Sequence, residues 1–519
     1  MDTTVKAPKL LFERILEHVL HFLHIHRIPL LATIVFGLMA HGFVFTNKFI
    51  NHDEVYNLFG KGATVDSGRW GLGALDSIFP NYSMPWIYGI LTVLLIAVSV
   101  CLIVSIFSIR NSTLQVLLAG CMVVFPLWVS TFAFMFTSSS YGVAFLMAVL
   151  SVYLLRKPHP FFWILALGCG IFSVAIYQAY IAIIASLLVL ILIQDLLLGE
   201  DIFRMLRRGF FYVAFLILTL GLYYIAAQAI MILKDVQFNQ YASERNSFDP
   251  STLPRNVTLA YSHFFRAFET GEYALIPSLF SQKLHRFAFT ACGILLLVLC
   301  IIKKIKISRI LFILALAAVF PLAVNCMYLF TTEAAVHTLV LCGFLSIYVP
   351  LIMIADLCVS EIPGKKHMDL LRHTAVNLLV LALAGIVISN IYFANEAYLE
   401  QHLQYENTYA FYTSLLSDIR MHPEFDEDTK LAVIGRWTYP DYFFRKFEFT
   451  YHLFGHLNSS PEEYSMDRFL EYYIGFTIPF AADAEVAQIR DSAEYLQMPV
   501  YPYYGSIQMF GDTLVVKLS

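Results

Sequence analysis

The chain has 519 residues, of which 59% are hydrophobic and only 14% are charged, and its mean hydropathy is +0.68. Ordinary soluble domains are about 45–50% apolar and about 25% charged, so this composition excludes a soluble globular protein and indicates a polytopic membrane protein. The formal net charge of −4 says little, because in a membrane protein the distribution of charge between the two sides matters more than its sum. We expect no nucleic-acid partner.

The segment before the first apolar run, residues 1–28, is expected to contain an amphipathic helix. Between residues 10 and 27, apolar side chains recur at helical spacing, and charged residues and histidines occupy the other face. Such a helix lies in the interface of a membrane with its apolar face against the acyl chains. We place it on the cytoplasmic surface.

Apolar runs long enough to cross a membrane recur from residue 29 onwards. Crossing the hydrocarbon takes about 20 mostly apolar residues, and on this basis we predict a bundle of eleven α-helical spans over residues 29–393. They lie near 29–47, 85–107, 112–132, 140–155, 161–176, 179–195, 210–233, 286–302, 308–329, 336–356 and 372–393. The run 161–194 is too long for one helix, and we divide it at the polar stretch Tyr177-Gln178-Ala179-Tyr180.

Lysine and arginine set the orientation, because they are enriched in short cytoplasmic loops. With the N-terminus inside, the short cytoplasmic segments hold half of the 34 Lys and Arg residues. The odd number of spans then places the loops 48–84 and 234–285 and the tail 394–519 outside. All eight cysteines fall in or at the ends of spans, so we expect no disulfide in the outer segments, which favours a bacterial plasma membrane.

The first outer loop carries the most informative polar residues. The stretch Asn51-His52-Asp53-Glu54 is followed by Ser67-Gly68-Arg69-Trp70. Charges are costly in hydrocarbon and common at its edges, so an acidic pair at the mouth of the bundle suggests chemistry on a membrane-borne substrate. A carboxylate can take the proton of an acceptor hydroxyl, and the planar fork of arginine suits phosphate oxygens. An ordinary solvated loop end is the alternative.

Further candidates lie in the first loop, in the turn at 177–180 and in the 234–285 loop. The candidate substrate-binding residues are His52, Trp70, Tyr177, Gln178, Tyr180 and His263, and the candidate donor phosphate-binding residues are Arg69, Arg255 and Arg266. Gln178 is notable because an amide in an apolar turn must find polar partners. For the tyrosines the alternative is an interfacial anchor, and for the 234–285 loop it is solvated surface charge.

The tail, residues 394–519, is predicted to form a small α/β domain. It begins with a helix through residues 405–419 and contains the strand-like segments 430–434 and 513–517. It is rich in Tyr and Phe, as sugar-binding surfaces often are, and a packed lid on the bundle is the alternative. The chain has no phosphate loop and no dinucleotide-binding glycine motif, and the inner loops are too short to fold a nucleotide-sugar domain.

Together these motifs resemble a known family. The two first-loop stretches, Gly60 with Gly62 between them, and Ile176-Tyr177-Gln178-Ala179-Tyr180-Ile181 resemble the bacterial serotype-converting glucosyltransferases that decorate O-antigen. The resemblance covers roughly residues 10–393. It implies a multispan glycosyltransferase-like bundle that takes a hexose, glucose above all, from a polyprenyl-phosphate donor such as undecaprenyl phosphate glucose on the outer face of the membrane.

The resemblance also assigns roles. It makes Asp53 and Glu54 the catalytic acidic pair, with Asp53 the favoured base, Arg69 the Gly-Arg arginine and Gln178 the Tyr-Gln element. Glu54 stands where family members often have Asp, which leaves open which acid is the base and whether Mg²⁺ or Mn²⁺ binds between them. The implied acceptor is a cell-surface or lipid-linked glycan. The rival functions are a lipid-linked oligosaccharide flippase or polysaccharide transporter, and an O-antigen polymerase or ligase that relies on the 234–285 loop.

Overall fold

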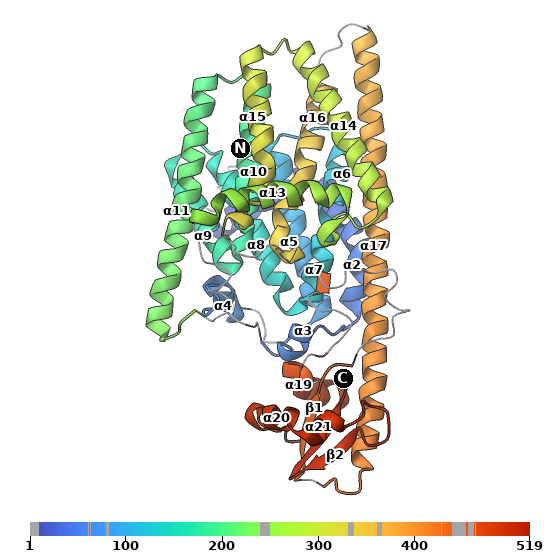
Figure 1. The fold of residues 1–519 in the computed structure, drawn as a ribbon. Helices are drawn as coiled ribbons and strands as arrows, with labels where there is room; N and C mark the ends of the chain where they lie inside the picture. The colour runs from blue at the N-terminus through green and yellow to red at the C-terminus, as the bar shows by residue number, and fades with distance from the viewer. Residues whose placement is uncertain are drawn as a thin grey trace, which may run out of the picture.

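The structure is a computed structural model that describes residues 10–60, 62, 64–78, 82–238, 250–330, 337–360, 366–426, 428–437, 453–454, 461 and 463–519. An elongated helical bundle occupies most of the molecule, and a small domain lies at one end of it (Figure 1).

Helices in the bundle correspond to all eleven predicted spans. Within the described residues, ten helices are long and apolar enough to cross a membrane, and α9 (Pro160–Ile176) is apolar but shorter. The others are α2 (Arg27–Thr46), α5 (Pro85–Ile106), α6 (Ser112–Val123) with α7 (Pro126–Ala133), α8 (Met135–Leu155), η1 (Gln178–Tyr180) with α10 (Ile181–Leu197), α11 (Ile202–Lys234), α14 (Leu279–Ile302), α15 (Ile307–Val324), η5 (Thr338–Ile347) with α16 (Tyr348–Ser360), and α17 (Lys366–Arg420). The predicted polytopic α-helical fold is confirmed.

The division of the run 161–194 is also as predicted. α9 ends at Ile176, Tyr177 is extended with φ −155° and ψ 118°, and the 3₁₀ turn η1 leads into α10. Nearly every side chain of α10 is buried, as expected for a helix that is apolar on all sides and lies inside a bundle. The turn at Tyr177 therefore lies where a central helix begins, beside the first outer loop.

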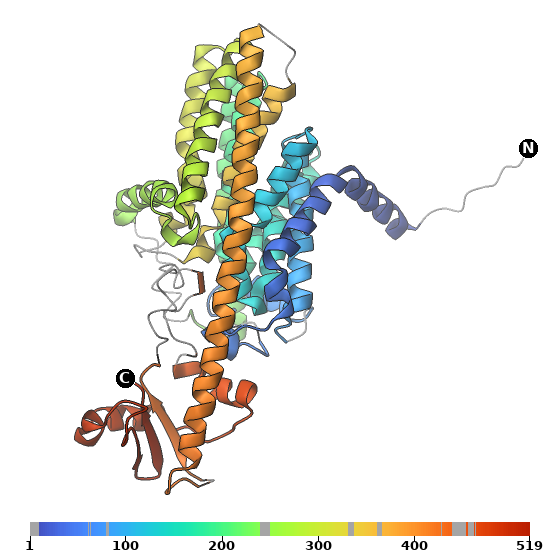
Figure 2. The ribbon, with the colours of Figure 1, turned by 90° about the vertical axis from the view of Figure 1, so that its right-hand side faces the viewer.

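The N-terminal helix α1 (Leu11–Ile25) leaves the bundle at an angle (Figure 2). Its apolar side chains, among them Phe12, Ile15 and Val19, are exposed. An exposed apolar face is the feature of a helix that lies on a membrane surface. Its position on the cytoplasmic side stays a prediction.

In the described part of the 234–285 segment, residues 250–285 are largely helical. Its main element is the amphipathic helix α13 (Leu253–Glu269), flanked by η2 (Pro250–Thr252) and η3 (Glu272–Ala274). α13 packs on α14, α15, η3 and η4 (Cys326–Phe330), and it lies across the direction of the spans (Figure 1).

Helix α17 joins the bundle to the tail. It runs for 55 residues without a break, about 80 Å at 1.5 Å per residue, and extends beyond the bundle into the small domain (Figure 2). The predicted start of the tail at residue 394 therefore falls inside a continuous helix, and the predicted helix at 405–419 is its last part.

The small domain contains the two predicted strands and one more. β1 (Lys430–Ile434) pairs in parallel with β3 (Thr513–Lys517), and β2 (Ile507–Phe510) pairs antiparallel with β3, so the sheet order is β1-β3-β2. The turn between β2 and β3 is closed by Gly511 at φ +64°, a left-handed conformation that glycine adopts without strain. The short helices are η7 (Glu463–Ser465), α19 (Met466–Phe469), η8 (Leu470–Ile474), α20 (Asp483–Arg490) and α21 (Ala493–Gln497).

The tail and the first outer loop share one core. Ile50 and Val55 of the loop are buried with Tyr412 of α17 and with Met466 and Phe469 of α19. Farther in, the tail residues Leu453 and Phe454 are buried in the bundle itself. The hydroxyl of Ser130 donates a 2.7 Å hydrogen bond to the Leu453 carbonyl. The tail is therefore packed against the mouth of the bundle.

Candidate active site in the first outer loop

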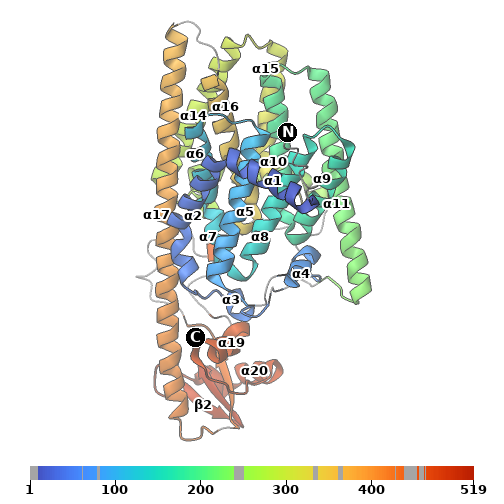
Figure 3. The same cartoon turned by 180° about the vertical axis from the view of Figure 1, so that it is seen from behind.

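Two short helices order the first outer loop, α3 (His52–Tyr56) and α4 (Trp70–Asp76). Both lie at the end of the bundle next to the tail (Figure 3). Asn51 caps α3, since its Oδ1 accepts a 2.9 Å hydrogen bond from the backbone N–H of Asp53, a frequent N-cap interaction. Its Nδ2 donates to the Phe454 carbonyl of the tail. One side chain thus fixes both the start of α3 and the approach of the tail.

Glu54 is a buried carboxylate with several hydrogen-bond partners. Its side chain is 1% exposed, and its Oε1 accepts hydrogen bonds from the Lys48 ammonium and the Ser83 hydroxyl. Its Oε2 accepts a 3.1 Å bond from the backbone N–H of Phe136 at the start of α8. Burial lowers the pKa of the Lys48 ammonium, and the charge of Glu54 opposes that shift. Glu54 therefore joins the two ends of the loop to each other and to α8, and both of its oxygens accept hydrogen bonds.

Asp53, by contrast, faces outward. Its side chain is 43% exposed. Its Oδ1 accepts a 2.7 Å hydrogen bond from the hydroxyl of Tyr464 in the tail. Its Oδ2 lies 3.9 Å from Nε2 of His52 and accepts no hydrogen bond from the described residues. Of the two predicted acids, Asp53 is the one whose carboxylate can reach a substrate.

Arg69 has unused hydrogen-bonding capacity close to Asp53. Its Nε is buried without a hydrogen-bond partner, and it forms no ion pair within the described part of the chain. Its guanidinium carbon lies 5.0 Å from the ring centre of Tyr177, and Tyr177 stacks on Tyr141 with ring centres 4.8 Å apart. Burial acts to lower the pKa of Arg69, but the field of the surrounding tyrosines and of Asp53 raises it overall. A guanidinium with an unpartnered N–H near a carboxylate suits a phosphate-bearing substrate.

The Arg69 loop is held in place by Gln178 and Tyr223. Nε2 of Gln178 donates to the Ser67 carbonyl at 3.0 Å and to the Tyr223 hydroxyl at 2.8 Å, and that hydroxyl donates to the Gly68 carbonyl at 3.1 Å. Gly68 has φ +74°, and a Cβ there would lie 2.8 Å from the Tyr223 hydroxyl oxygen. Gln178 thus positions the loop, and Tyr223 is a partner that the sequence alone did not indicate.

The remaining predicted substrate-binding residues of the first loop and of the turn at 177–180 make other contacts. The His52 ring meets Tyr464 edge to face. The indole N–H of Trp70 is buried without a hydrogen-bond partner, and its ring packs near Val65 and Met231. Tyr180 is buried at the start of α10.

The predicted residues of the 234–285 segment are not brought to the first loop. Arg255 and Arg266 lie on the exposed face of α13. His263 is buried. Its Nδ1 is 3.0 Å from the Tyr273 hydroxyl and its ring stacks on Tyr328. Since α13 packs on α14, α15, η3 and η4, whereas α4 packs on α9, these side chains form a separate group.

In this arrangement Glu54 is not free to help Asp53 hold a divalent cation. Such a cation needs several oxygen ligands, but Glu54 is already neutralised by the Lys48 ammonium. Within the described residues no group of three or more His, Cys, Asp or Glu side chains is arranged to hold a metal ion.

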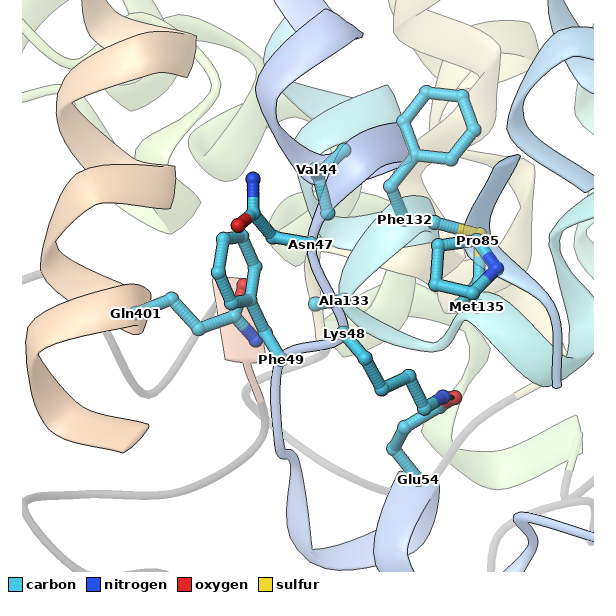
Figure 4. Close-up of a pocket in the computed structure, with 10 residues that line it drawn as sticks. All are labelled: Val44, Asn47, Lys48, Phe49, Glu54, Pro85, Phe132, Ala133, Met135 and Gln401. Carbon is cyan, nitrogen blue, oxygen red and sulfur yellow. Dashed lines mark hydrogen bonds and ion pairs between the residues drawn. The ribbon is translucent and has the colours of Figure 1, made fainter. Parts of the chain in front are cut away.

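A small pocket lies beside the Lys48–Glu54 pair. It lies between the end of α2, α7 and α17, and its lining includes Asn47, Phe132 and Gln401 (Figure 4). Neither Asp53 nor Arg69 lines it. The pocket is thus separate from the Asp53 carboxylate and the Arg69 guanidinium.

Comparison with known proteins gives the family. The sequence model of the family described as "Glucosyl transferase GtrII" matches residues 42–350, a region that contains the first outer loop, the turn at Tyr177 and α13. No curated protein and no solved structure matches the chain. Because the match covers more than half of the chain, the protein belongs to the GtrII glucosyl transferase family and is a glucosyltransferase.

Proposed function

We propose that the protein transfers glucose from a polyprenyl-phosphate donor to a hydroxyl of a surface or lipid-linked glycan, on the outer face of a bacterial plasma membrane. The observation that carries the proposal is that an exposed Asp53 carboxylate and an Arg69 guanidinium with an unpartnered Nε lie at the same end of the bundle. Family membership favours transfer over the flippase, transporter, polymerase and ligase alternatives.

The proposed reaction is a single displacement at the anomeric carbon. The acceptor oxygen forms a bond to C1 of glucose, while the bond from C1 to the phosphate oxygen breaks and its electron pair leaves with the polyprenyl phosphate. The proton of the acceptor hydroxyl passes to Oδ2 of Asp53, the oxygen that accepts no hydrogen bond from the described residues. Arg69 stabilises the negative charge that develops on the leaving phosphate, as preorganised donors do elsewhere.

The sidedness and the donor class rest on the distribution of charge and chain length. Basic residues favour the end of the bundle opposite the first loop as the cytoplasmic side. The connections at that end are short, and a nucleotide-sugar domain needs far more chain than they provide. A lipid-phosphate donor that is made inside and presented outside fits a site on the outer face and requires no cytoplasmic nucleotide-sugar domain.

The test is transfer by the purified full-length protein in detergent, with glycan released from the host surface as acceptor. Radiolabelled glucose should appear in the glycan when polyprenyl-phosphate glucose is supplied. Supply of UDP-glucose alone should give none. Efficient transfer from UDP-glucose without a lipid intermediate would overturn the proposed donor.

A further inference from the structure

Beside Asp53, a row of aromatic side chains crosses the junction of the first loop and the tail. We define it as the aromatic seam: Tyr56, Phe59, Tyr82, Tyr464 and Tyr472. Tyr56, Phe59, Tyr82 and Tyr464 are between 46% and 59% exposed. Exposed apolar side chains gathered in this way often mark a binding surface.

The rings of the seam meet edge to face. Phe59 contacts Tyr82 at 5.1 Å and Tyr472 at 4.8 Å between ring centres, with interplanar angles of 89° and 84°. Tyr56 contacts Tyr464 at 5.8 Å with an angle of 63°. In such pairs the edge of one ring covers part of one face of the other, and the Arg468 guanidinium lies over the Tyr472 ring at 5.8 Å from its centre. The remaining exposed surface of the rings is available to a ligand.

Polar groups border the seam on the tail side. Nη1 of Arg468 donates to Oε2 of Glu471 and to the Tyr472 hydroxyl, each at 3.1 Å, and both charged side chains are partly exposed. Stacking faces beside a guanidinium and a carboxylate match a sugar, which has C–H faces and a rim of hydroxyls. The negative faces of the rings attract weakly positive C–H groups, and the charged pair can bind hydroxyls.

The seam leads directly to the exposed acid. Tyr464 contacts Tyr56 within the seam and donates to Oδ1 of Asp53, so a ligand on these two rings lies next to the carboxylate. The surface is supported from below, because α3 packs on η7 and α19 and Val55, Met466 and Phe469 are buried together. Membrane anchoring is the other common use of exposed aromatic residues, but it does not explain the bond from Tyr464 to Asp53.

We propose that the aromatic seam is the binding site for the acceptor glycan and that the tail thereby selects the acceptor. The role as acceptor site rests on the proposed function, while glycan binding itself can be measured without the donor. The occupant is a carbohydrate chain whose sugar rings stack on Phe59 and Tyr472 and whose reacting hydroxyl lies at Asp53.

The test uses purified full-length protein in detergent and a defined probe. The probe is oligosaccharide released by mild acid from the surface glycan of a host strain that lacks this protein. Calorimetric titration without donor should show binding to the wild type. Phe59→Ala combined with Tyr472→Ala should raise Kd by about tenfold, since both ring surfaces on which the sugar stacks are removed.

Two controls separate stacking from folding. Tyr472→Phe keeps the ring and should bind within about twofold of wild type. Tyr503→Ala combined with Tyr504→Ala removes exposed tyrosines elsewhere in the tail and should leave Kd unchanged. Thermal unfolding of every variant checks that the fold is intact.

The outcomes distinguish the seam from the donor proposal. Unchanged Kd in the Phe59→Ala/Tyr472→Ala variant, or no binding to the wild type, would overturn the seam. A change confined to thermal stability would show that the rings only stabilise the fold and would also overturn it. Failure of transfer from polyprenyl-phosphate glucose, with seam-dependent glycan binding intact, would count against the donor and not the seam.

Discussion

The hydroxyl of Tyr464 donates a 2.7 Å hydrogen bond to Oδ1 of Asp53, and the two residues are 411 positions apart in the chain. The bond joins the tail to the exposed acid of the first outer loop. It leaves Oδ2 as the oxygen available to a substrate, and it keeps the carboxylate in one orientation. Tyr464→Phe is therefore expected to lower kcat by about tenfold, the effect of losing a hydrogen bond to a charged group, with little change in the donor KM.

Arg69 is predicted to act on the donor phosphate. Arg69→Ala should raise the donor KM and lower kcat together, because it removes the cation from both the bound donor and the leaving group. Arg69→Lys should recover only part of the activity, since it restores the charge without the planar fork. Steady-state kinetics with polyprenyl-phosphate glucose measure both effects. Full activity in Arg69→Lys would show that geometry at this position is unimportant.

The Lys48–Glu54 pair is predicted to be structural. Glu54→Gln leaves a largely buried ammonium without its counterion, and removing one partner of a buried pair costs about 3–5 kcal/mol; the partial exposure of Lys48 places the effect at or below the lower end. The double change Lys48→Met with Glu54→Leu should unfold at a higher temperature than Glu54→Gln. Thermal unfolding in detergent decides this. Equal stability of Glu54→Gln and wild type would contradict it.

Gly68 and Tyr223 provide a matched test of how the Arg69 loop is held. Gly68→Ala should reduce activity by at least about tenfold, because its Cβ would lie 2.8 Å from the Tyr223 hydroxyl oxygen at φ +74°. Adding Tyr223→Phe removes that oxygen and should restore part of the loss. If the double variant is no more active than Gly68→Ala, the clash is not what disturbs the loop.

The orientation in the membrane is tested by reporter fusions. A fusion at Lys304, in the turn between α14 and α15, should report the cytoplasm, and a fusion at Ser519 should report the outside. The reason is the enrichment of lysine and arginine in the short segments at the Lys304 end. If both fusions report the cytoplasm, the tail and the proposed site lie on the cytoplasmic side and the orientation is wrong.

Local patterns in the sequence predict the spans and the tail strands well. The break at Tyr177 and the strands at 430–434 and 513–517 follow from polarity and spacing within a few residues. The partners of the acidic pair do not follow from local patterns. Lys48 binds Glu54 because of the path of the loop between them, which local spacing does not determine. Tyr464, the partner of Asp53, comes from the far end of the chain. The same limit applies to α13, since amphipathic spacing predicts its helix but not the elements it packs against.

The most direct measurement is the initial rate of glucose transfer from polyprenyl-phosphate glucose by the wild type and by Asp53→Asn. General-base catalysis contributes about 10²–10⁴-fold, so Asp53→Asn should lower kcat by that factor while the donor KM stays within about twofold of wild type. Asp512→Asn, which changes an exposed acid of the tail, should transfer at the wild-type rate. A wild-type rate in Asp53→Asn would contradict the account, because it would leave the exposed carboxylate without a role in the reaction.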